Sequence, residues 1–186
     1  FLRCVPNLTL MTPSDENELW LMLNTGYDLK TPVAVRYPRG SGPGSEITHL
    51  EEKIEIGKAR TLKEVDSDVV LLSFGSLLPI AEEISEELNY SLIDMRFVKP
   101  IDESLLLKLA RSNKLLVTLE ENVVAGGAGS AVNEVLNQNF ISTNVLNIGI
   151  PDHFPKVGSA LDQKKEAGLS KENIIEQINK KLNSMK

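Results

Sequence analysis

The sequence has 186 residues, and 20 lysines and arginines against 26 aspartates and glutamates give a formal net charge of -6. Its apolar share of 41% and charged share of 25% are typical of a globular protein with a buried core. The negative charge argues against nucleic-acid and anionic-membrane partners, because both require a basic face. The single cysteine, Cys4, excludes an internal disulfide and a cysteine-based zinc cluster. No apolar run approaches a membrane span, so we expect a cytoplasmic protein.

The N-terminal part has the pattern of a strand, a helix and a second strand. The apolar stretch Leu8–Met11 is followed by Ser14 and Asp15, either of which is a good helix N-cap. Apolar residues then recur at helical spacing, and the β-branched segment Val33–Val35 predicts a short strand. The chain begins at Phe1 without an initiator methionine or an element-start signal, so we expect it to be cut from a longer protein.

From about residue 53 onward, short apolar segments alternate with amphipathic ones. This alternation predicts a mostly parallel sheet that is covered by helices on both faces. The predicted strands are Val69–Phe74, Ser91–Met95, Leu115–Leu119 and Asn144–Ile148. Two of the predicted helices end near Leu88 and near Leu136. Three more span Asp102–Arg111, Ala160–Ala167 and Ser170 to about Leu182. The expected fold class is therefore α/β, with three α/β/α layers.

Two glycine-containing turns follow predicted strands and would lie at the carboxyl edge of the sheet, where ligands bind in open α/β folds. One turn contains Gly126, Gly127 and Gly129, and the other contains Gly75 and Ser76. The backbone amides of these turns could form a small anion-binding crevice. The turn with Gly126, Gly127 and Gly129 does not have the spacing of a dinucleotide-binding or Walker A loop. The alternative is a pair of tight βα turns, with Ser76 as an ordinary helix N-cap.

The remaining polar residues give weaker signals. Glu120 and Glu121 close a predicted strand, and their like charges could raise the pKa of one carboxylate. We expect instead that one of them is hydrogen-bonded to backbone and the other is solvated. The two histidines, His49 and His153, have no partner at metal-ligand spacing and are expected on the surface. We therefore expect no metal site in this chain.

The best local candidate for ligand binding is the segment Arg-Tyr-Pro-Arg-Gly at 36–40. Pro38 restricts φ, and Gly40 lets the backbone turn away. Side chains alternate along an extended segment, so Arg36 and Arg39 point to opposite sides and only one of them reaches a given ligand. Arg39 could bind a phosphate in a bidentate manner, and Arg36 is expected to form a structural ion pair.

Six segments in order along the chain carry a family pattern. They are residues 1–6 (FLRCVP), 11–18 (MTPSDENE), 34–40 (AVRYPRG), 94–102 (DMRFVKPID), 120–122 (EEN) together with 126–136 (GGAGSAVNEVL), and 146–152 (LNIGIPD). With them the chain resembles the 1-deoxy-D-xylulose-5-phosphate synthase family, whose members are thiamine diphosphate enzymes of the transketolase superfamily. The β subunits of 2-oxoacid dehydrogenases share the last domain, but they match segments 34–40 and 94–102 less well.

The resemblance implies an enzyme that joins pyruvate to glyceraldehyde 3-phosphate with loss of carbon dioxide. It implies thiamine diphosphate and Mg²⁺ as cofactors, a homodimer, and a product that feeds isoprenoid, thiamine and pyridoxal phosphate synthesis. Residues 1–44 would be the end of the pyrimidine-binding domain, 45–55 a linker, and 56–186 the transketolase C-terminal domain. By the same resemblance, Arg39 matches the arginine that holds the phosphate of the aldehyde substrate.

The family's motif for the metal and diphosphate, its activating glutamate and its active-site histidines are missing from this sequence. We therefore expect no catalytic residue in this chain and no turnover by the chain alone. The alternative function is a non-catalytic module that dimerises and binds an anion in the crevice of the two glycine-containing turns. The N-terminal strands, separated from the rest of their sheet, would leave an unpaired edge that is either disordered or re-paired.

Overall fold

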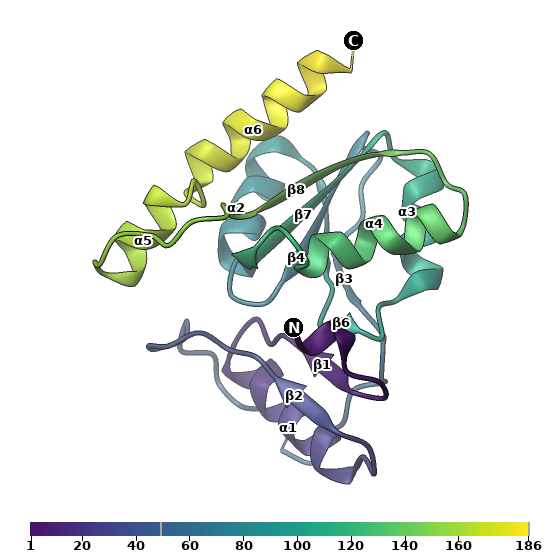
Figure 1. Ribbon diagram of the computed structural model, residues 1–186, viewed down its shortest axis with the longest axis vertical. Helices are drawn as coiled ribbons and strands as arrows, with labels where there is room; N and C mark the ends of the chain where they lie inside the picture. Colours follow the sequence, from purple (N-terminus) through teal and green to yellow (C-terminus); the bar gives the residue numbers. More distant parts are fainter. Residues whose placement is uncertain (49, 186) are drawn as a thin grey trace.

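The structure is a computed structural model that describes residues 1–48 and 50–185. A small N-terminal unit, whose elements run from Leu2 to Val35, lies against a larger C-terminal unit, whose elements run from Arg60 to Ser184 (Figure 1). His49 lies outside the described residues. His153 is exposed, as expected. No helix among the described residues is long and apolar enough to cross a membrane.

The N-terminal unit contains the strand, helix and strand that the sequence predicts. Strand β1 (Thr9–Met11) pairs in parallel with β2 (Val33–Val35), and helix α1 (Glu16–Asp28) connects them. A single 3-10 turn, Leu2–Cys4, precedes β1. The Asp15 carboxylate accepts a hydrogen bond of 2.7 Å from the Glu18 amide, which makes Asp15 the N-cap of α1.

The free edge of β1 is closed by a strand from the C-terminal part of the chain. Strand β6 (Phe97–Lys99) pairs antiparallel with β1 and completes a sheet of order β2-β1-β6. The sequence analysis did not predict β6 as a strand, because three residues are too few for a periodicity signal. Strand β1 is thus paired on both sides, as the alternative of re-pairing expects, and β2 remains at the edge of the sheet.

The C-terminal unit is built on a second sheet with the strand order β3-β5-β4-β7-β8. Its strands are β3 (Arg60–Lys63), β4 (Val69–Phe74), β5 (Ser91–Asp94), β7 (Leu115–Val123) and β8 (Asn144–Ile150). All neighbours are parallel except β3 and β5, which confirms the mostly parallel sheet. The sequence analysis missed β3, an edge strand that is mainly polar and only half-buried.

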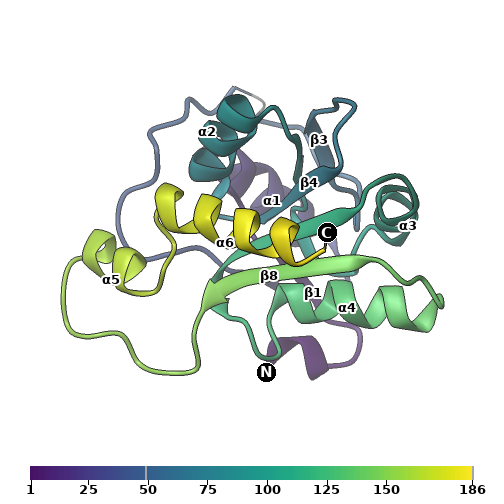
Figure 2. The same ribbon diagram turned by 90° about the horizontal axis from the view of Figure 1, so that it is seen from above.

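Helices cover both faces of this sheet, which confirms the three-layer α/β/α arrangement (Figure 2). Helices α3 (Glu103–Ser112) and α4 (Ala128–Gln138) pack on one face, and α2 (Leu78–Leu88) and α6 (Lys171–Ser184) pack on the other. The short helix α5 (Ala160–Glu166) follows an exposed loop. Alternate residues of β4 enter the two cores, which is why all six of its positions are buried.

A buried ionic network joins the two units. The Arg96 guanidinium donates to both carboxylate oxygens of Glu18 on α1, at 2.8 and 2.6 Å. Arg60 lies 3.3 Å from Glu18 and 3.2 Å from Asp94. The Ser14 hydroxyl donates to Asp94 at 3.0 Å, so each unit contributes carboxylate and donor groups to the same cluster. Glu18 and Asp94 are almost fully buried, and the network therefore holds the units in one relative position.

Candidate functional site

The glycine-rich turn before α4 is occupied by a carboxylate of the chain itself. The buried side chain of Glu120, on β7, accepts hydrogen bonds from the amides of Ala128 at 2.7 Å and Gly129 at 2.8 Å. Burial raises the pKa of Glu120, and these two amides oppose that shift. A Cβ at Gly127 would lie only 2.6 Å from the Val123 carbonyl oxygen and would also collide with the Glu120 carboxylate, so a glycine is required there.

The amides that the sequence analysis assigned to an anion at Gly126, Gly127 and Gly129 therefore face competition from Glu120. An external anion would have to displace a buried carboxylate that already interacts with the N-terminus of α4. The anion crevice stays a prediction. The positive φ angles of Gly75 and Gly126, +77° and +74°, agree with the alternative of two tight βα turns.

Ser76 does not cap α2, and that expectation is wrong. The helix begins at Leu78 without a side-chain cap, and the Ser76 hydroxyl donates instead to the Glu121 carboxylate. Lys164 of α5 lies 3.0 Å from the same carboxylate. Of the two glutamates, Glu120 is bonded to backbone as expected. Glu121 is not solvated, because its side chain is only 17% exposed and paired with Ser76 and Lys164.

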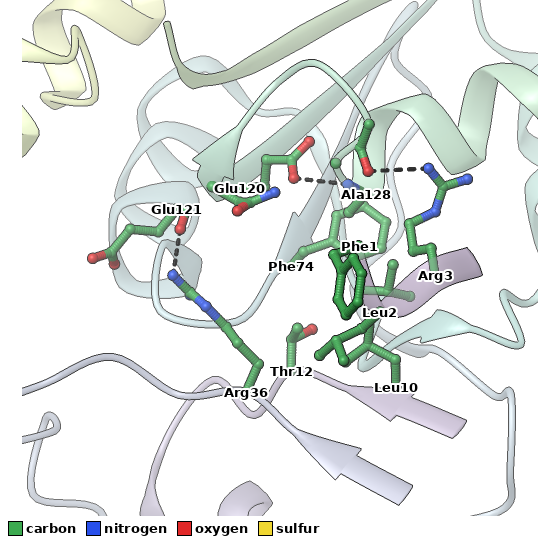
Figure 3. A pocket seen from close by; sticks show the side chains of 14 residues that line it. Phe1, Leu2, Arg3, Leu10, Thr12, Arg36, Phe74, Glu120, Glu121 and Ala128 are labelled. Atoms are coloured by element: carbon green, nitrogen blue, oxygen red, sulfur yellow. Dashed lines mark hydrogen bonds between the residues drawn. The ribbon is translucent and has the colours of Figure 1, made fainter. Parts of the chain in front are cut away.

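Arg36 links the units through a backbone carbonyl. Its guanidinium donates to the carbonyl oxygen of Glu121, and its own amide donates to Met11 at 2.9 Å (Figure 3). The expected ion pair of Arg36 is therefore wrong in kind: the observed partner is a neutral carbonyl. The bond still has the structural role that the sequence analysis proposed, because it ties the end of β2 to the end of β7.

A cavity of about 210 Å³ lies between the two units beside Arg36. It is lined by the apolar side chains of Leu10, Phe74 and Val98 and by the charged residues Arg36 and Glu120. Figure 3 shows arginines entering it from two sides, with Arg3 opposite Arg36. Arg3 donates to the Gly126 carbonyl at 3.1 Å and pairs with Glu134, so its charge is used within the chain. Arg39 is not among the residues that line this cavity.

Arg39 lies on an exposed loop that follows β2. Within residues 1–48 and 50–185, no hydrogen bond or ion pair engages its guanidinium. Gly40, next to it, has a φ of +122°, which favours glycine and turns the backbone. The loop is then held where the amides of Gly44 and Ser45 donate to the Glu16 carboxylate at 2.9 and 3.0 Å. Glu16 is a contact residue that sequence reasoning missed, because nothing in its local pattern indicates that partner.

Among the described residues, no three or more histidine, cysteine, aspartate or glutamate side chains are grouped so that they could hold a metal ion. The structure therefore brings together a glutamate-capped turn, a cavity between the units, and an exposed arginine on a pinned loop. Only the last of these offers a charged group that is free to bind a ligand.

Comparison with known proteins matches residues 57–174 to the family described as "Transketolase, C-terminal domain". The chain is similar to the 1-deoxy-D-xylulose-5-phosphate synthase of Hahella chejuensis, with 49% identity over 185 residues. It is also similar to the enzyme of the same name from Pectobacterium atrosepticum, with 52% identity over 179 residues. These alignments cover 100% and 96% of this chain but only 29% and 28% of the relatives.

Solved structures agree with the family match. A "Split gene transketolase, inactive beta4 tetramer" superposes with a TM-score of 0.83 and 30% identity, over 96% of this chain and 58% of that chain. Transketolase from Leishmania mexicana superposes with a TM-score of 0.65 at 18% identity, over 94% of this chain and 25% of that chain, which shows a shared fold alone. The family match covers more than half of the sequence, and the chain therefore belongs to the transketolase C-terminal domain family.

Proposed function

We propose that this chain is the C-terminal part of a 1-deoxy-D-xylulose-5-phosphate synthase. The full enzyme would condense pyruvate with glyceraldehyde 3-phosphate, with loss of carbon dioxide, and act as a cytoplasmic homodimer. Its product would feed isoprenoid, thiamine and pyridoxal phosphate synthesis. The relatives that are 49–52% identical to this chain carry this enzyme name, which supports the proposal.

Within that enzyme, Arg39 would bind the phosphate of the aldehyde substrate. The observation that carries this role is its position: Arg39 is exposed on a loop, and none of the residues that the structure describes pairs with its guanidinium. A guanidinium with free donors can form two parallel hydrogen bonds to a phosphate. Pyruvate has no phosphate, so this contact would distinguish the two substrates.

The described residues do not fit thiamine diphosphate or Mg²⁺. No cluster of metal-ligating side chains occurs among them, and the α4 amides that could meet a diphosphate are bonded to Glu120. We therefore assign the binding of both cofactors to other parts of the full enzyme. The contribution of this chain would be to bind and orient the phosphorylated acceptor.

The test is Arg39→Ala in the full-length enzyme, with Arg39→Lys beside it. Loss of a charge-assisted phosphate contact should cost about 1.5–3 kcal/mol, which is roughly a ten- to hundredfold loss in kcat/KM for glyceraldehyde 3-phosphate. The KM for pyruvate should change little. The parent enzyme and Arg39→Ala should use unphosphorylated glyceraldehyde equally well. Equal losses for both substrates would contradict the role of Arg39.

A second function, self-association without catalysis, is favoured by one observation. Several large apolar side chains are almost fully exposed, among them Tyr27, Phe140, Phe154 and Val157. Phe154 and Val157 lie three residues apart on one exposed loop, and apolar side chains that are gathered on a surface often mark contacts between chains. Sedimentation of the 186-residue chain over a range of concentrations tests this: a compact monomer at the highest concentration would count against it.

A further inference from the structure

The loop that carries Arg39 is exposed along most of its length but is attached at both ends. Residues 37–44 form no helix or strand, and all of them except Pro38 are exposed. A free loop of this composition, with three glycines among eight residues, would sample many conformations. Two side chains outside residues 37–45 restrict it: Arg36 acts at its beginning and Glu16 at its end.

At its beginning, the loop is attached to the C-terminal unit. Arg36 donates through its guanidinium to the Glu121 carbonyl, and its backbone amide continues the β1–β2 ladder by donating to Met11. Glu121 is itself held by Ser76 and Lys164. The position from which the loop departs is therefore defined by both units.

At its end, the loop is attached to the first turn of α1. The two carboxylate oxygens of Glu16 accept from the amides of Gly44 and Ser45, one each. The amides of Glu16 itself, Ser45 and Gly44 lower the pKa of this carboxyl, which keeps it ionised as a double acceptor. A side chain at Gly42 would collide with the Glu16 carboxylate, so a substitution at this position would displace that carboxylate from the loop.

We propose that Glu16 and Arg36 are positioning residues for Arg39. Together they hold a loop that would otherwise be mobile, so that the Arg39 guanidinium is already placed when the phosphorylated acceptor arrives. Ordering the loop in advance lowers the entropy that binding would otherwise lose. The inference rests on the phosphate-binding role of Arg39 proposed above.

Glu16→Ala in the full-length enzyme tests the inference by the direction in which it changes the KM for glyceraldehyde 3-phosphate. Removing a negative charge near a phosphate site should by itself strengthen anion binding. Loss of positioning should do the opposite and raise the KM for glyceraldehyde 3-phosphate roughly three- to tenfold, with the KM for pyruvate unchanged. Glu46→Ala is the matched control, because it removes an exposed acid from the same segment, one residue beyond Ser45. A fall in the acceptor KM of Glu16→Ala would overturn the inference.

Gly42→Ala is a second variant that leaves α1 intact and displaces only the Glu16 carboxylate. Amide hydrogen exchange of the 186-residue chain reads out the attachment directly. Both variants should speed up exchange at Gly44 and Ser45 but not in β1, whereas unchanged protection at these amides would overturn the inference. If Arg39→Ala is selective for the acceptor and Glu16→Ala is not, the positioning role alone fails. If Arg39→Ala is not selective, the proposed role of Arg39 fails first.

Discussion

The charged side chains at the junction between the two units differ in burial and in pairing from Arg39 on the loop after β2. At the junction, Glu18 and Asp94 are almost fully buried and are satisfied by arginines of the same chain. On the loop, Arg39 is exposed and, among the described residues, unpaired. The charges at the junction are paired within the chain, and the charge of Arg39 is available to a ligand. This difference supports a stabilising role for the junction and agrees with the binding role proposed for Arg39.

The largest expected effect comes from breaking the junction. Arg96→Met would leave Glu18, which is 1% exposed, without the guanidinium that donates to both of its carboxylate oxygens. Removing one partner of a buried ion pair should lower the free energy of unfolding by about 3–5 kcal/mol. Urea unfolding measures this loss.

The control for that variant is Lys108→Met. Lys108 and Glu64 form an ion pair of 3.3 Å with side chains that are 66% and 70% exposed. Exposed pairs of this kind contribute about 0–1 kcal/mol. Similar losses in the two variants would show that the junction does not differ from an ordinary surface, and the comparison would fail.

The junction should also respond to pH through Asp94. Burial first, and then the nearby charge of Glu18, raise the pKa of Asp94 to about 6 from an ordinary value of 3.8, against the opposing effects of Arg60, Ser14 and Arg96. A raised pKa in the folded state means that the stability contributed by this group is fully present below about pH 4 and is lost as the pH rises through about 6.

Asp94→Asn removes this titration. Relative to Asp94→Asn, the parent chain should lose roughly 1–3 kcal/mol of unfolding free energy between about pH 4 and pH 7. The measurement is urea unfolding of both chains across that range. A constant difference between them would show that Asp94 does not titrate there.

A smaller effect is expected at the glycine-rich turn. Glu120→Ala frees the amides of Ala128 and Gly129 and should destabilise α4 by about 0.5–2 kcal/mol, as the loss of a helix cap does. Inorganic phosphate should then raise the melting temperature of the variant more than that of the parent chain, because the amides are open to an anion. An equal or larger rise in the parent chain would mean that Glu120 does not compete, and the predicted crevice would stand.

The periodic elements of this protein could be predicted from local pattern. The strands β4, β5, β7 and β8 follow predicted apolar segments, and Asp15, one of the two N-caps that the sequence offers for the first helix, is confirmed as the N-cap of α1. These signals are local, because a cap or an apolar stripe depends on residues only a few positions apart. The turn of the backbone at Gly40, next to Arg39, followed from the same kind of reasoning.

The partners of the polar side chains could not be predicted in this way. Arg36 meets a carbonyl in place of a carboxylate, Ser76 meets Glu121 in place of a helix amide, and Glu120 fills the turn that was expected to receive an anion. In each case the residue type was compatible with several partners. The choice depended on which one tertiary packing brought within hydrogen-bond distance.

The sequence by itself determined the α/β class, the mostly parallel sheet, the order of the helices and the family pattern, because these depend on local periodicity and on motifs. Only the tertiary structure decided that β6 closes the N-terminal sheet, that Arg96 and Glu18 meet across 78 residues of sequence, and that Glu16 holds the end of the Arg39 loop. Short strands and single polar contacts carry no periodic signal. Their energy comes from burial and geometry that exist only once distant segments have packed together.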